Sequence, residues 1–356
     1  MAGLTPMMQQ YMETKKQYKD CILFYRLGDF YEMFFEDAIT ASRELEITLT
    51  GKDCGLEERA PMCGVPFHAV DGYLNRLVSK GYKVAICEQV EDPKLAKGIV
   101  KREVIRIVTP GTNLNTQALE ESKNNYLMCI ACFQNRIGVS IVDVTTGDFY
   151  MTEVEGLAKL QDEIYKYMPT EIICNDAFVM SGYDIEDLKG RLGMAVYTLE
   201  PWYFDDDGCR KCLMNHFKVN TLAGLGLEDF PSGMISAGAA MQYLLETQKT
   251  DLTHINHIIP YLASRFMLLD SSTRRNLELT ETLREKQKKG SLLWVLDKTK
   301  TAMGARRLRS DIEQPLINID DINARLDAVE QLCKNTVSRD EIREYLNPIY
   351  DMERLL

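Results

Sequence analysis

The run FYRLGDFYEMFF at residues 24–35 constrains the fold more than any other stretch of this chain. Aromatic and aliphatic residues lead into Gly28-Asp29, a pair that breaks a strand and begins a turn. After this turn, Phe30 and Glu32 stand two positions apart, so on a strand their side chains would share one face. The ordinary interpretation is a strand end with buried aromatic rings and a solvated glutamate.

A second interpretation is a contact with nucleic-acid bases. An aromatic ring can stack on a base or wedge between two bases, and a carboxylate can hydrogen-bond a base edge. The net charge of −11 argues against a general binder of nucleic acid. The charge is uneven, however: residues 1–115 hold 15 Lys and Arg against 16 Asp and Glu, whereas the remainder holds 27 against 37. The nearly neutral part is the part that contains Phe30.

Strand-like and helix-like segments alternate through the first 113 residues, which predicts a compact α/β domain over 1–113. A helix is expected after Thr5-Pro6, where Thr is a good N-cap and Pro suits the first turn. Further helices are expected at 36–46 and 70–80, and strands at 22–26, 47–50, 84–89 and 104–109.

The polar residues 114–125 have no clear period and are predicted to form a linker. A second α/β domain is expected over 126–255, beginning with a hairpin around Gln134-Asn135. One last strand is expected at 266–269, and the spacing of apolar residues then becomes helical, so 256–356 is predicted to begin a helical domain.

The composition is that of a soluble globular protein, with 45% hydrophobic and 27% charged residues. The apolar runs are too short for a transmembrane helix, and residues 1–20 lack a signal-peptide core, so a cytoplasmic location is expected.

The ten cysteines suit reduced, buried thiols. Cys129 and Cys132 should face opposite sides of a strand and cannot easily share a zinc ion. Cys209 and Cys212 stand in a loop-like segment and are the better, though still weak, zinc candidates.

Several longer blocks resemble the MutS family of DNA mismatch-repair proteins. These blocks occur in the family's order and at its spacing, and the resemblance extends over nearly the whole chain. They lie at 21–34, 61–69, 84–89, 106–112, 272–279 and 301–309.

This resemblance implies a mixed-sheet α/β mismatch-recognition domain, a ribonuclease-H-like α/β connector and the start of an all-helical core domain. It implies that Phe30 inserts beside a mismatch while Glu32 hydrogen-bonds a base, either as an acceptor or, when protonated, as a donor. Gly28 would serve the turn. Further candidates for DNA contact are Arg26, Met33, Lys52, Lys101 and Thr109, and a basic run of Lys94, Lys97, Lys101, Arg102 and Arg106 could hold phosphates.

The resemblance also implies partners and cofactors: duplex DNA with mismatches or small loops, a homodimer, MutL and the sliding clamp, in a bacterial cytoplasm. The chain contains no G-x-x-x-x-G-K-[ST] phosphate loop, so no cofactor and no enzymatic activity are expected for it. ATP and Mg²⁺ would bind a further domain of a longer parent protein, of which this chain would be a fragment.

Two other classes of function remain open. Asp143, Asp148 and Glu153 could hold Mg²⁺ in a nuclease built on the connector, although a fold-level analogy is a weak argument for activity. The connector could also be a pure protein-interaction module. One position departs from the family pattern: Asp311 stands where an aromatic residue is usual, which puts the local packing in doubt.

Overall fold

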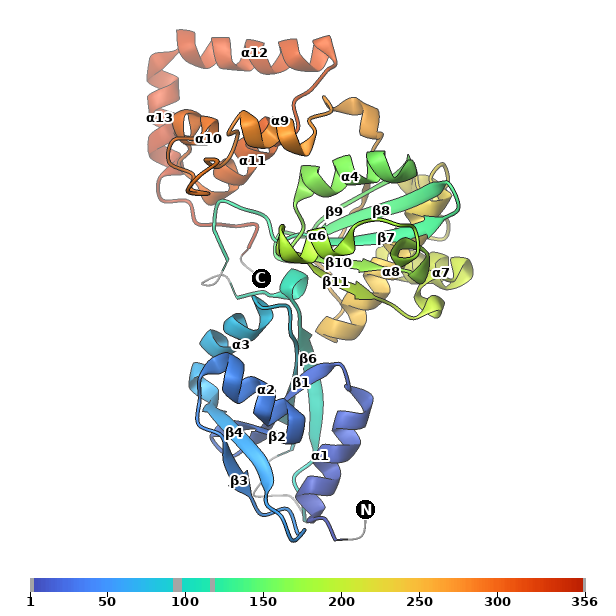
Figure 1. Ribbon diagram of the computed structural model, residues 1–356. Helices are drawn as coiled ribbons and strands as arrows, with labels where there is room; N and C mark the ends of the chain where they lie inside the picture. Colours follow the sequence, from blue (N-terminus) through green and yellow to red (C-terminus); the bar gives the residue numbers. More distant parts are fainter. Residues whose placement is uncertain (1–2, 92–97, 116–118, 355–356) are drawn as a thin grey trace. The chain divides into compact units, whose positions relative to one another are not determined.

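The structure is a computed structural model that describes residues 3–91, 98–115 and 119–354. Contacts divide the chain into two compact units, one of Met1–Asn115 with Tyr243–Leu252 and the other of Thr116–Gln242 with Thr253–Leu356. Figure 1 labels their helices and strands. The expected multidomain arrangement of mixed α/β sheets followed by helices is confirmed. The domain boundaries given above stay predictions.

The first unit is a six-stranded mixed sheet with helices on both faces (Figure 1). Its strand order is β3-β4-β2-β1-β5-β6, in which only β1 and β5 run parallel. Its elements are α1 (Pro6–Gln17), β1 (Cys21–Leu27), β2 (Phe30–Phe34), α2 (Phe35–Leu45), β3 (Thr50–Lys52), β4 (Ala60–Pro66), η1 (Phe67–Ala69), α3 (Val70–Val78), β5 (Lys83–Gln89), β6 (Arg102–Val108) and η2 (Pro110–Thr112).

Two apolar cores fill this unit, one on each face of the sheet. Phe24, Tyr31 and Met33 pack beneath α2 and α3. Tyr25 and Phe34 pack beneath α1 on the opposite face. The strand alternation therefore sends neighbouring residues of β1 and β2 into different cores. The strand predicted at 47–50 is displaced, because the chain pairs with β4 only from Thr50 to Lys52.

The second unit contains another six-stranded mixed sheet, ordered β11-β10-β7-β8-β9-β12. Its elements to residue 265 are β7 (Leu127–Phe133), β8 (Arg136–Asp143), β9 (Asp148–Glu155), α4 (Gly156–Tyr167), β10 (Glu171–Cys174), α5 (Asp176–Val179), α6 (Ile185–Gly190), β11 (Ala195–Thr198), η3 (Pro201–Phe204), α7 (Asp206–Phe217), η4 (Ala223–Leu225), α8 (Pro231–Gln248), β12 (Ile259–Pro260) and η5 (Ala263–Arg265). The expected hairpin around Gln134-Asn135 is confirmed as β7–β8.

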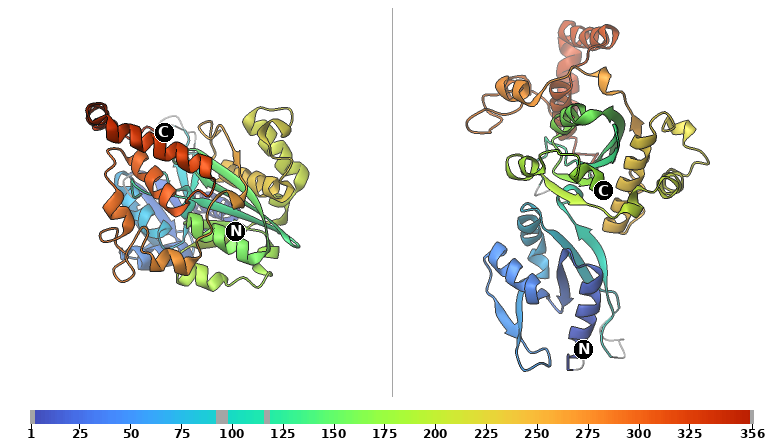
Figure 2. Two further views of the ribbon diagram at one scale, coloured as in Figure 1. Left: turned by 90° about the horizontal axis from the view of Figure 1, so that it is seen from above. Right: turned by 45° about the vertical axis from the view of Figure 1, so that its right-hand side comes forward.

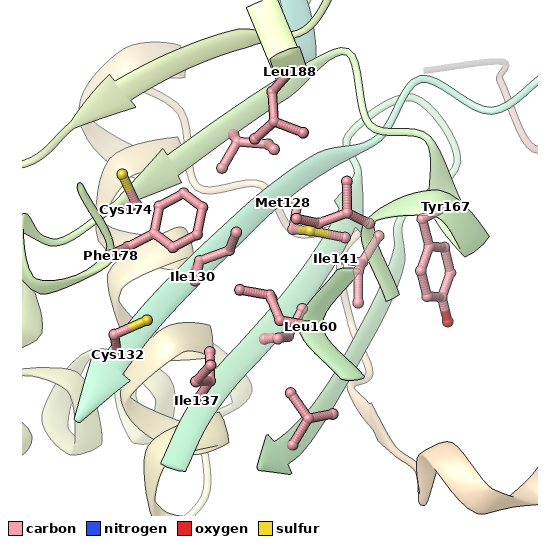
Figure 3. Close-up of a cluster of buried hydrophobic side chains, with 14 of the residues drawn as sticks. Met128, Ile130, Cys132, Ile137, Ile141, Leu160, Tyr167, Cys174, Phe178 and Leu188 are labelled. Carbon is pink, nitrogen blue, oxygen red and sulfur yellow. The ribbon is translucent and has the colours of Figure 1, made fainter. Parts of the chain in front are cut away.

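The apolar core beneath α4, α5 and α6 is drawn in Figure 3, where Met128, Ile130 and Cys132 of β7 project to one side of the sheet. Helix α8 packs on the other side. A Cβ at Gly138 would lie 1.8 Å from the Ser232 carbonyl oxygen, so only glycine permits this approach of helix to strand. Figure 2 gives two further views of these helices around the sheet.

The elements after residue 270 are helices: α9 (Ser271–Asn276), α10 (Leu292–Leu296), α11 (Ala302–Glu313), α12 (Ile319–Lys334) and α13 (Thr336–Leu346). The strand predicted at 266–269 is wrong, since Phe266 forms only an isolated bridge with Leu316. Asp311 is partly exposed and forms ion pairs with Arg307 and Arg325 at 3.2 and 3.1 Å. Its side chain therefore does not occupy an apolar core. Among the described helices, none is long and apolar enough to cross a membrane.

Candidate nucleic-acid interface

A tight turn carries the two residues of the predicted site. β1 ends at Leu27, β2 begins at Phe30, and these two residues are cross-strand partners, so Gly28 and Asp29 alone form the connection. Gly28 has a φ of +60°, a left-handed conformation that side chains disfavour. No atom lies within 4 Å of a Cβ built at Gly28, so the backbone conformation, rather than space, is the reason for glycine here.

Phe30 and Glu32 lie on one face of β2. Tyr31 and Met33, which alternate with them, are buried in the core beneath α2 and α3. Phe34 packs edge-on against Tyr11 of α1, with 4.9 Å between ring centroids, so Phe30 and Glu32 belong to the face that α1 covers in part. The Phe30 side chain is nevertheless 46% exposed. A large exposed ring on a tight turn is available to a partner.

Glu32 is held by a lysine from another strand. The Nζ of Lys52, in β3, forms an ion pair with Oε2 of Glu32. Strand β4 lies between them and places Gly64 opposite Glu32. A Cβ at Gly64 would come within 3.5 Å of the Glu32 Cγ, so the glycine leaves room for the glutamate side chain.

Arg26 is occupied inside the unit. Its guanidinium lies 3.4 Å from a Glu88 carboxylate oxygen, and its Nε donates to the Gly28 carbonyl oxygen at 2.5 Å. Glu88 also accepts the Tyr31 hydroxyl, and burial together with this carboxylate raises the pKa of Tyr31. Through these contacts Arg26 supports the turn, and its predicted DNA contact stays a prediction.

The sequence did not single out Glu88 or Gly64, although both lie beside the site. Glu88 is the penultimate residue of β5, the strand parallel to β1, so an acid there falls next to Arg26. A signal existed in principle: a charged pair at the ends of two adjacent strands. Without the strand order, nothing in the sequence connects residues 26 and 88.

Two of the predicted DNA contacts lie inside the unit. Met33 is fully buried in the apolar core, and Thr109 is fully buried as well. The Thr109 hydroxyl shares a 2.7 Å hydrogen bond with Thr112 in a capping box that begins η2. Neither side chain is at the surface of the structure, and the two DNA contacts stay predictions.

The basic run is only partly supported. Lys101 is exposed and forms an ion pair with Glu103, while Arg102 donates to the Arg26 carbonyl oxygen and to Gln10. Burial lowers the pKa of Arg106. Lys94 and Lys97 lie outside the described residues. Of this run, Lys101 is the described cation with an exposed side chain, so it stays a candidate for phosphate contact.

The acidic residues of the second unit do not form an open metal site. Asp143 and Asp148 are direct cross-strand partners, which the sequence did not predict. Oδ1 of Asp143 accepts from the Thr145 N–H and hydroxyl, and Oδ2 accepts from Asn124 and Asn125, at 2.6–3.0 Å. Hydrogen-bond donors thus already surround a carboxylate that a metal would need.

Glu153 points elsewhere, toward Arg136 and the Ser232 N–H. Burial, with Asp143 nearby, raises the pKa of Asp148. Within the described ranges, no group of three or more His, Cys, Asp or Glu could hold a metal ion. The geometry therefore offers no support for a nuclease.

The cysteine pairs also lack the geometry of a zinc site. Cys209 and Cys212 lie in helix α7 and not in the predicted loop. The Cys209 thiol approaches the carbonyl oxygens of Tyr203 and Ile235, and burial raises its pKa to about 12. Burial likewise raises the pKa of Cys212 to about 11. Zinc binds thiolates, so burial that favours the protonated thiols works against metal binding at this pair.

Comparison with known proteins gives matches along almost the whole chain. Three family models match: MutS domain I at residues 5–117, MutS domain II at 125–256 and MutS domain III at 272–356. The DNA mismatch repair protein MutS of Lachnoclostridium phytofermentans is 68% identical over 356 residues, covering 100% of this chain and 38% of that protein. The MutS proteins of Ruminiclostridium cellulolyticum and Acetivibrio thermocellus are 57% and 55% identical, each over 100% of this chain and 41% of the relative. The chain thus spans about two fifths of the length of these relatives.

Proposed function

The chain belongs to the MutS family of DNA mismatch repair proteins, and from this membership we propose that its first unit recognises mispaired or looped duplex DNA. Phe30 inserts beside the mismatch, and Glu32 hydrogen-bonds one of its bases. The supporting observation is the exposed ring of Phe30 at the start of β2, on the same face as the Glu32 carboxylate.

The physical basis of recognition is the weakness of a mispaired step. Such a step is poorly stacked and easily kinked, so a ring enters it at a lower cost than at a paired step. Stacking of a base on an aromatic ring contributes roughly 1–3 kcal/mol and offsets part of the unstacking cost. Phe30 thus reads the deformability of the duplex, and the sequence around the step matters little.

Glu32 adds a contact that depends on the base. A carboxylate near phosphates is repelled unless it makes a specific hydrogen bond. A base displaced from its pair exposes donors and acceptors that a paired base keeps occupied. Glu32 therefore favours a step where a base edge is free, and it penalises intact duplex.

The remaining functions belong to a longer protein. We assign ATP and Mg²⁺ binding, homodimer formation and the coupling to MutL and the sliding clamp to the protein as a whole, because this chain spans about two fifths of its relatives. Residues 126–255 are then the connector through which recognition is passed on.

A chimera tests the proposal in a protein of natural length. The chain replaces the matching 356 residues of the L. phytofermentans protein, to which it is 68% identical. Dissociation constants are measured for three duplexes: one with a G·T mismatch, one with an extra T and one fully paired. Phe30→Ala is expected to reduce the preference for the first two duplexes by at least roughly tenfold, because stacking is lost.

The control is Phe133→Ala, which removes another ring, 36% exposed, from the second unit. This variant is expected to keep the preference. If Phe30→Ala discriminates the three duplexes as the unsubstituted chimera does, the proposed function of Phe30 is wrong.

A further inference from the structure

The ion pair between Glu32 and Lys52 has no role in the proposal above. Among the residues that the structure describes, Lys52 is the one side chain that hydrogen-bonds or ion-pairs with the Glu32 carboxylate. The pair is partly shielded, with 16% of the Glu32 side chain and 32% of the Lys52 side chain exposed. Shielding from water strengthens such a contact relative to a pair at the open surface.

The surrounding fold restricts both partners. Lys52 belongs to β3, where it pairs with Ala60 of β4, and its Nζ lies 5.7 Å from the centroid of the Phe34 ring. The Glu32 side chain lies beside Gly64 of β4, a residue that has no side chain to obstruct it. The lysine therefore reaches across an intervening strand to one particular oxygen, Oε2, of the glutamate.

We propose that Lys52 is a positioning residue that sets mismatch selectivity through Glu32, and this inference rests on the function proposed above. The ammonium group holds the glutamate side chain in one conformation before DNA arrives, which reduces the ordering cost of the base contact. Loss of Lys52 then weakens the contact that Glu32 makes at a mismatch and leaves binding to paired duplex almost unchanged.

A direct phosphate contact by Lys52 makes a different prediction. Such a contact would strengthen binding to paired and mismatched duplexes equally, and its removal would lower the salt dependence of binding by about one ion. The two roles thus differ in selectivity, in salt slope and in their dependence on Glu32.

A double-mutant cycle in the chimera separates them. The variants are Lys52→Met, Glu32→Gln and the two combined, with Lys52→Arg as the conservative replacement. Lys52→Met is expected to reduce the ratio of mismatched to paired affinity by roughly 3- to 10-fold, the range for the net contribution of one partly exposed hydrogen bond. Lys52→Arg should restore most of the ratio. In the Glu32→Gln background, Lys52→Met should change it by less than about twofold, because little charge coupling remains.

The matched control is Lys80→Met, which removes another partly exposed lysine of the same unit, paired with Glu44 at 3.0 Å. It should leave the ratio unchanged. The inference is overturned if Lys52→Met weakens binding to all three duplexes equally and lowers the salt dependence of binding, and if it has the same effects in the Glu32→Gln background. Its failure is distinguishable from failure of the proposed function, because Phe30→Ala would then still abolish the preference.

Discussion

The guanidinium group of Arg26 lies over the ring of Phe67, with 3.9 Å between Cζ and the ring centroid. Phe67 directly follows β4 in the chain. The same guanidinium contacts Glu88 of β5 and the carbonyl oxygen of Gly28. Arg26 thereby connects three elements to the turn that precedes Phe30. The stacked geometry suits arginine, whose planar cation packs on rings better than the ammonium of lysine.

We expect Arg26→Met to destabilise the first unit by about 1–3 kcal/mol, because it leaves Glu88 without its cation and the turn without its donor. Native-state hydrogen exchange of the β1 and β2 amides measures this loss. Arg43→Met, which removes an arginine that is 69% exposed, should cost less than about 0.5 kcal/mol. If Arg26→Met leaves exchange unchanged but weakens binding to every duplex, Arg26 contacts DNA and does not support the turn.

Met33 gives a prediction about the core. Met33→Ala should destabilise the first unit by about 2–5 kcal/mol, since it creates a cavity beneath α2 and α3. The same hydrogen-exchange measurement checks it. Met180→Ala, at an 83% exposed position, is the matched control and should be almost neutral. An exposed Met33 that touches DNA would instead give normal stability and reduced mismatch affinity, contrary to this account.

The buried thiol of Cys132 predicts a dependence of stability on alkaline pH. Burial raises its pKa from 9.0 to about 11. Between these values the unfolded chain has lost the proton that the folded chain keeps, so stability falls as pH rises. Between pH 8 and pH 10 this thiol accounts for a loss of about 1 kcal/mol.

Cys132→Ala should therefore lose about 1 kcal/mol less than the unsubstituted chain over the same interval. Urea unfolding followed by the fluorescence of Trp202 and Trp294, both in the second unit, measures the difference. Cys333→Ala, which removes an exposed thiol, is the control for a cysteine substitution outside the core. Identical pH profiles for Cys132→Ala and the unsubstituted chain would contradict the prediction.

Asp143 provides a test of metal binding. Its four hydrogen-bond donors predict that Asp143→Asn destabilises the second unit by about 1–3 kcal/mol, because an amide cannot accept all four bonds. Millimolar Mg²⁺ or Mn²⁺ should not change the melting temperature of the chain, and labelled duplex should stay intact. Metal-dependent cleavage that Asp143→Asn abolishes would support the nuclease interpretation instead.

The sequence predicts the elements of this fold better than their contacts. The period-2 and helical patterns place β1, β5 and the β7–β8 hairpin correctly, because each pattern is local. Strand 47–50 is displaced and strand 266–269 is wrong, because edge pairing depends on partners far along the chain. Cys209 shows the same limit: local composition suggested a loop, but Asp205 caps a helix whose buried face packs against α8.

The site divides in the same way. The alternation along β2 puts Phe30 and Glu32 on one face, as their spacing predicts. The Lys52 pair and the Arg26–Glu88 pair require the strand order β3-β4-β2-β1-β5, which no local pattern contains. The burial of Met33 follows from alternation with Glu32 and could have been predicted from the same period.

A photocrosslink tests the central claim, insertion of Phe30 at the mismatch, most directly. A G·T duplex carries 5-iodouracil in place of the mispaired thymine, and the crosslinked peptide of the chimera is identified by mass spectrometry. The account predicts a crosslink at Phe30 that is absent with Phe30→Ala and at least roughly tenfold weaker with the fully paired duplex. A crosslink of equal yield on paired duplex, or one that maps outside the β1–β2 turn and persists in Phe30→Ala, would contradict it.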